Sequence, residues 1–164
     1  MLAAVDFIAQ DVFEALTPAG DMLAVSIGDP GQLPPANLAG FRAVLRLEFL
    51  DCDQADVEQH GVPECVLCTP AQLQQLVDFV RQHHAAVPPL RLVVHCRMGS
   101  SRSAAVALIA HHLTECDFPR HPDTHHANRH VLDLAAAALG ARVPAAGKHA
   151  GDEPHPYLPL GLQI

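Results

Sequence analysis

The chain has 164 residues and contains no tryptophan, and aromatic residues make up only 4% of it. Its core must therefore be built from aliphatic side chains and alanine. No stretch approaches the roughly 18 consecutive apolar residues of a membrane-spanning helix, so we expect no such span. The segment Met1–Asp6 lacks a basic start followed by a long apolar run, so we expect no secretory signal peptide.

Positive charge is also scarce. The chain has 10 Lys and Arg against 18 Asp and Glu, a formal net charge of −8, which disfavours nucleic acids and anionic membranes as partners. The cysteines number five, an odd count that favours a reducing, cytoplasmic location over a framework of disulfides. Cys65 and Cys68 form a lone Cys-x2-Cys, and without a second pair this motif is a weak indication of a metal site. We expect no metal and no other cofactor.

The composition is that of a globular protein, with 49% hydrophobic and 17% charged residues. A chain of this length can bury a substantial core in one domain. We therefore predict a single domain over residues 1–164, with its core in about 22–140. Residues 141–164 are rich in Pro and Gly and are expected to form an irregular tail, with Tyr157, Leu158 and Leu160 against the body of the domain.

Hydrophobic periodicity predicts an α/β fold with a central, mainly parallel, twisted sheet flanked by helices. Apolar residues at helical spacing predict an amphipathic helix over residues 3–16. Further helices are expected at 70–84, where Thr69 and Gln72 form a capping box, and at 103–115 and 128–139. Strands are expected at 22–27, 43–49 and 92–94. Residues 54–67 are interpreted as an insertion.

The most informative stretch is residues 93–103, which predicts a strand, a compact loop and a helix in direct succession. Such a loop directs several backbone N–H groups at one point, next to the positive end of the helix dipole, and this arrangement suits an anion with several oxygens. Cys96 lies where the strand ends, at the floor of the loop. Thiols beside a helix N-terminus and an arginine ionise readily, which makes them nucleophiles.

The other side chains of the loop have chemistry that suits this arrangement. Arg102 can bind two oxygens of one anion with its planar guanidinium. Gly99 permits a positive φ and a close approach of the anion. Ser103 can cap the helix or donate to the sulfur, and His95 can hold the loop through its ring nitrogens. The amide groups expected to hold the anion belong to Arg97, Met98, Gly99, Ser100, Ser101 and Arg102.

The string His95-Cys96, five residues, Arg102-Ser103 resembles the His-Cys-x5-Arg-Ser/Thr signature of the cysteine-dependent protein tyrosine and dual-specificity phosphatases, in their small, bacterial-type form. The resemblance implies a phosphatase-like fold with the phosphate-binding loop between a strand and a helix. It also implies a phosphocysteine intermediate on Cys96, without a metal.

The family also uses a loop aspartate upstream of the cysteine as general acid. If the strands run parallel, Asp51 follows the strand at 43–49 and lies at the same sheet edge as Cys96. Asp51 is therefore the first candidate for the acid that protonates the leaving oxygen. The interval from Asp51 to Cys96 is longer than in compact family members, so Asp53 and Glu64 stay as alternatives.

The resemblance implies a hydrolase acting on phosphotyrosine, or on phosphoserine and phosphothreonine as well. Arg97 is the sole extra base in the loop, which argues against polyanionic substrates such as inositol polyphosphates. Two alternatives are a phosphatase of a non-protein ester, such as a nucleotide, sugar or inositol phosphate, and a catalytically dead phosphate-binding module. The partner is accordingly a phosphorylated protein or a small phosphate ester, and the oligomeric state is left open.

Overall fold

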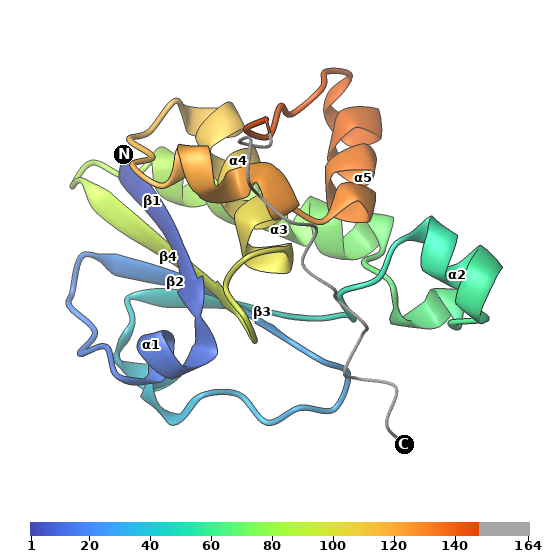
Figure 1. Cartoon of the computed structure of the whole chain (residues 1–164). Helices are drawn as coiled ribbons and strands as arrows, with labels where there is room; N and C mark the ends of the chain where they lie inside the picture. Colours follow the sequence, from blue (N-terminus) through green and yellow to red (C-terminus); the bar gives the residue numbers. More distant parts are fainter. Residues whose placement is uncertain (148–164) are drawn as a thin grey trace.

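A computed structural model describes residues 1–147 of the chain. Its sheet has four parallel strands in the order β1-β4-β2-β3, shown in Figure 1. The strands are β1 (Leu2–Ala9), β2 (Met22–Gly28), β3 (Ala43–Glu48) and β4 (Leu90–Cys96). The prediction of an α/β fold with a parallel sheet flanked by helices is confirmed.

Helices cover the two faces of the sheet unequally. On one face, α3 (Pro70–His84), α4 (Arg102–Thr114) and α5 (Arg129–Leu139) enclose the main core with the sheet. On the other face, α1 (Gln10–Glu14) and the short 3-10 helix η1 (Ala36–Gly40) cover a smaller core around Phe13 and Phe41, whose rings stack 5.1 Å apart. The remaining helical segments are α2 (Gln54–His60), η2 (Glu64–Val66) and η3 (His121–His126).

The predicted helix over residues 3–16 is wrong. Leu2–Ala9 form strand β1, and helix α1 covers only Gln10–Glu14. The strand is apolar on both faces, since Val5 and Phe7 belong to the main core while Ile8 packs against the smaller one. A doubly buried strand has a near-continuous apolar run, and such a run also satisfies the spacing of a helix face.

The core therefore begins earlier than expected. Residues Leu2, Val5 and Phe7 are buried, as is Val143 beyond the other predicted limit, so the predicted core of 22–140 was too short at both ends. The other elements lie close to their predicted ranges. Segment 54–67 forms α2 and η2 around a small separate cluster of Cys52, Val62 and Leu67. Tyr157, Leu158 and Leu160 lie outside the described residues.

The parallel arrangement brings four strand ends to one edge of the sheet. Ala9 lies opposite Cys96, and Gly28 lies opposite Glu48, so the segments that follow β1, β2, β3 and β4 all emerge there. In open parallel sheets this edge is where ligands bind. Within residues 1–147 no helix combines the length and apolar character needed to cross a bilayer.

Candidate active site

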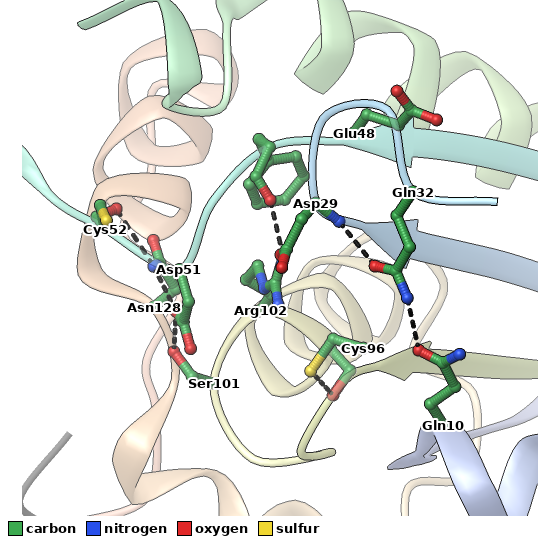
Figure 2. Close-up of polar contacts among 12 residues, drawn as sticks. Gln10, Asp29, Gln32, Glu48, Asp51, Cys52, Cys96, Ser101, Arg102 and Asn128 are labelled. Atoms are coloured by element: carbon green, nitrogen blue, oxygen red, sulfur yellow. Dashed lines mark hydrogen bonds and ion pairs between the residues drawn. The ribbon is translucent and has the colours of Figure 1, made fainter. Parts of the chain in front are cut away.

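A short loop, residues 97–101, joins Cys96 at the end of β4 to the first residue of α4. Cys96 ends β4 and is 1% exposed, and α4 begins at Arg102 only six positions later. Cys96 Sγ lies 3.1 Å from Ser103 Oγ, which places the sulfur against the first turn of α4 (Figure 2). Ser103 thus lies within hydrogen-bond distance of the sulfur, and a contact with the sulfur was one of the two roles expected for it. Ser101, rather than Ser103, occupies the N-cap position, and its side chain makes no capping hydrogen bond.

Gly99 allows the loop to rest directly on the end of β1. Its φ is +65°, and an added Cβ would lie 2.2 Å from Ala9 N and 2.4 Å from the carbonyl carbon of Ile8. A backbone hydrogen bond adds to this contact: the Gln10 N–H donates to Arg97 O at 3.3 Å. Strand β1, which was predicted to be helical, therefore determines the shape of the loop.

The guanidinium of Arg102 is anchored through Nη1, whereas its Nε–H donor has no partner among the described residues. The residue is 4% exposed, and its Nη1 donates to Asp29 Oδ1 at 2.8 Å and to the Phe49 carbonyl oxygen at 2.6 Å. Its Nε is buried and has no hydrogen-bond partner among the described residues. A buried donor without a partner costs about 1–3 kcal/mol, a cost that an added acceptor within hydrogen-bond distance would offset.

Asp29, which the sequence analysis did not single out, is the carboxylate that orients this guanidinium. Its backbone N–H donates to Gln32 Oε1, and Gln32 Nε2 donates to Gln10 Oε1 at 2.9 Å, so the turn after β2 is tied to α1 (Figure 2). Asp29 directly follows strand β2. The argument that selected Asp51, an acid at the carboxyl end of a parallel strand, would have identified Asp29 as well.

The ring nitrogens of His95 do not hold the loop as expected, because Nε2 contacts strand β2 and Nδ1 has no hydrogen-bond partner among the described residues. The residue is fully buried, its Nε2 lies 2.7 Å from Ser26 Oγ, and its ring stacks on Phe13 at 4.1 Å. Ser26 Oγ also accepts a hydrogen bond from Arg46 Nη1. Burial lowers the pKa of His95 to about 4, with smaller contributions from the positive charges of Arg46 and Arg102. His95 is therefore neutral at pH 7 and joins β4 to β2 and α1.

Of the three candidate acids, Asp51 is the one that hydrogen-bonds to the loop. Its Oδ1 accepts the Ser101 hydroxyl at 2.6 Å and Asn128 Nδ2 at 2.9 Å. Asp53 instead caps helix α2 by accepting from the N–H groups of Ala55 and Asp56. Glu64 is exposed in η2. The structure thus brings Asp51 to the edge that holds Cys96, as the parallel strands required.

Asn128 is a second residue that the sequence analysis missed as part of the site, since it was interpreted only as the start of a helix. Its backbone N–H donates to Ser101 O at 3.1 Å, and its side chain reaches Asp51. Polar residues before a helix are usually caps, so no local signal distinguished this residue from an ordinary one.

Open cavities lie on both sides of the loop. A cavity of about 290 Å³ adjoins Ser100 and Ser101, and Asp51, Asp53, Asp56 and Arg129 are among its lining residues. A wider one of about 710 Å³ adjoins Arg97 and Met98, and its lining includes Asp11, Glu14 and Asp29. In each cavity the carboxylates outnumber the single arginine, so the surroundings of the loop disfavour additional negative charge on any bound molecule.

Two of the other cysteines, Cys52 and Cys68, have the character of structural thiols. Burial raises the pKa of Cys52 to about 11, with further contributions from Asp56 and Asp51, and it raises the pKa of Cys68 to about 12. Both therefore stay protonated at neutral pH and are poor metal ligands and poor nucleophiles. Over residues 1–147 no group of three or more His, Cys, Asp or Glu side chains is arranged to hold a metal ion.

No protein-family model, curated protein or solved structure matches this chain. The chemical interpretation of the site therefore depends on the contacts described above.

The contact between Gly99 and β1 makes a first prediction. Gly99→Ala should reduce the free energy of unfolding by at least about 2 kcal/mol, because its Cβ would collide with backbone and its φ is unfavourable for alanine. Urea denaturation measures the change. Gly61→Ala is the matched control, since Gly61 has a φ of +65° but open space around it. Equal losses in the two variants would contradict the proposed close contact.

The depressed pKa of His95 predicts a loss of stability in mild acid. The unfolded chain takes up a proton on this residue near pH 6.5, whereas the folded protein does so only near pH 4, so stability falls as the pH drops through this window. From pH 7 to pH 5 the contribution of His95 amounts to about 2 kcal/mol. Urea denaturation at both pH values should show that His95→Asn removes this component of the pH dependence.

The exposed His112 supplies the comparison for this experiment. His112→Asn should keep the full pH dependence of the wild-type protein. A His95→Asn variant whose stability declines as steeply as that of the wild type would show that another group is responsible.

Proposed function

We propose that the protein is a phosphatase that hydrolyses phosphate monoesters through a phosphocysteine intermediate. Phosphotyrosine is the first candidate substrate, with phosphoserine and phosphothreonine next. The observation that carries this proposal is the buried guanidinium of Arg102, whose Nη1 is anchored while Nε lacks a partner among the described residues, at the end of a loop that begins after a buried cysteine. A tetrahedral anion above Cys96 would supply the missing acceptor.

In the first step the Cys96 thiolate attacks phosphorus in line with the ester oxygen. The S–P bond forms and the P–O bond to the leaving group breaks, while the backbone N–H groups of the loop and Arg102 stabilise the equatorial oxygens. The Asp51 carboxyl gives its proton to the leaving oxygen, so the alcohol or phenol departs neutral.

In the second step a water molecule attacks the phosphocysteine. The Asp51 carboxylate takes a proton from the water, an O–P bond forms, and the S–P bond breaks to return the thiolate and inorganic phosphate. Ser103 Oγ, 3.1 Å from the sulfur, can donate a hydrogen bond to the departing thiolate. Each group thus ends the cycle in its starting state, and no step uses a metal.

The charge around the loop supports a monoester whose remaining part carries no further phosphates. Arg97 and Arg102 are the two bases of the loop, and Asp29 already balances Arg102. The adjoining cavities are rich in carboxylates. A polyanionic substrate would meet net repulsion outside the loop.

Replacement of the nucleophile is the main test. With p-nitrophenyl phosphate and a chelator present, the wild-type protein should turn over and orthovanadate should inhibit it. Cys96→Ser should lower kcat by more than about a thousandfold. Acid quenching of the wild-type reaction should trap a phosphoprotein that the variant does not form.

Cys65→Ser is the matched control, because Cys65 is exposed and lies outside the loop, and its activity should equal that of the wild type. Turnover that survives Cys96→Ser would overturn the mechanism. Binding of phosphate by the wild-type protein without any turnover would indicate a binding module instead.

The choice of Asp51 as general acid makes a separate prediction. Asp51→Asn should lower kcat for phenyl phosphate by about 10²–10⁴, measured by steady-state kinetics. Asp53→Asn keeps the cap of α2 and Glu64→Gln alters an exposed side chain, so each should have a much smaller effect. If either of these two variants shows the larger loss, that residue is the acid.

A further inference from the structure

We propose that Asn128 is a positioning residue that holds the Asp51 carboxyl against the phosphate-binding loop, in the orientation needed to protonate the leaving oxygen. This inference deepens the proposed function and depends on it. It assigns a specific catalytic consequence to an asparagine whose other visible role is to begin a helix.

Asn128 connects three parts of the site. Its Nδ2 donates to Asp51 Oδ1 at 2.9 Å and also lies 3.3 Å from the Cys52 carbonyl oxygen. Its backbone N–H donates to Ser101 O in the loop, and its Oδ1 accepts from the N–H of Val131 in α5. The residue is 6% exposed, and it lines the cavity of about 290 Å³ together with Asp51 and Ser101.

The donors on Asp51 determine which of its oxygens carries the proton. Ser101 Oγ and Asn128 Nδ2 both donate to Oδ1, so the proton of a neutral carboxyl belongs on Oδ2 (Figure 2). Loss of one donor frees the carboxyl to rotate and to present the wrong oxygen. Proton transfer requires reach within hydrogen-bond distance, so a carboxyl that rotates freely is a poorer acid.

Capping alone does not explain an asparagine at this position. A cap needs only an acceptor, and Ser, Asp and Asn serve about equally well in that role. Of these three residues, asparagine alone also supplies an N–H donor that can hold a carboxylate oxygen while its own oxygen caps the helix. Both groups of its side chain are used here.

This difference allows the two roles to be separated by substitution. Asn128→Ser keeps a cap for α5 and keeps the backbone N–H that donates to Ser101 O, but it removes the amide donor to Asp51. Asn128→Asp also keeps the cap but turns an acceptor toward the Asp51 carboxyl. Asn37→Ser is the matched control, because Asn37 donates to the Phe13 and Leu16 carbonyl oxygens away from Asp51.

The readout is the dependence of kcat on the leaving group. Phenyl phosphate leaves poorly and needs the acid, whereas p-nitrophenyl phosphate needs it much less. Asn128→Ser should lower kcat for phenyl phosphate about tenfold and that for p-nitrophenyl phosphate less than about threefold, with KM unchanged. Asn128→Asp should have a larger effect in the same direction, and Asn37→Ser should have none.

A double variant completes the test. Asp51→Asn combined with Asn128→Ser should be no slower than Asp51→Asn alone, because the donor has nothing left to orient. Equal losses for both substrates, or additive losses in the double variant, would overturn the inference and leave Asn128 a structural cap. Should the Asn128 variants fail to fold, Ser101→Ala removes the other donor to Oδ1 and must show the same selective loss. Absence of turnover in the wild-type protein would refute the proposed function itself.

Discussion

The arrangement of this molecule depends on the burial of one cation at the edge of its sheet. Arg102 is almost wholly enclosed, and a buried charge is tolerated only where a counter-charge and hydrogen-bond acceptors surround it. Asp29 after β2 and the Phe49 carbonyl after β3 supply them. These contacts connect the ends of β2 and β3 to the first turn of α4, which begins directly after the loop that follows Cys96.

The proposed site at this edge would bind an anion, although the protein as a whole is acidic. The formal net charge is −8, and carboxylates line both cavities beside the loop. Under the proposed function the attraction for an anion is local, since it would come from the helix terminus, the loop amides and one guanidinium. The carboxylates beyond that short range would then oppose substrates with more than a single phosphate group.

His95 and Asp51 are held by different neighbouring residues. His95 is kept neutral by burial and by nearby arginines, and it joins the strand beneath Cys96 to Ser26 and Phe13. Asp51 is linked instead to Ser101 and Asn128 on the side of α5. His95 thus fixes the strand end that carries Cys96, while the hydrogen bonds of the proposed acid reach the loop from the side of α5, so each can be altered with limited effect on the other.

The local pattern of residues in the sequence was enough to predict many of the helices and strands. The strand, loop and helix around Cys96, the capping box of α3 and the alternation in β3 are properties of neighbouring residues, so the sequence alone was enough to predict them and to bring Asp51 to the edge of Cys96. Only the tertiary structure decided that residues 2–9 form a strand, because this segment is apolar except for Asp6 and lacks the regular polar alternation that distinguishes a strand from a helix. It alone also placed Asp29 on Arg102 and Asn128 on Asp51, since these contacts join residues 73 and 77 positions apart, and no periodicity encodes such pairs.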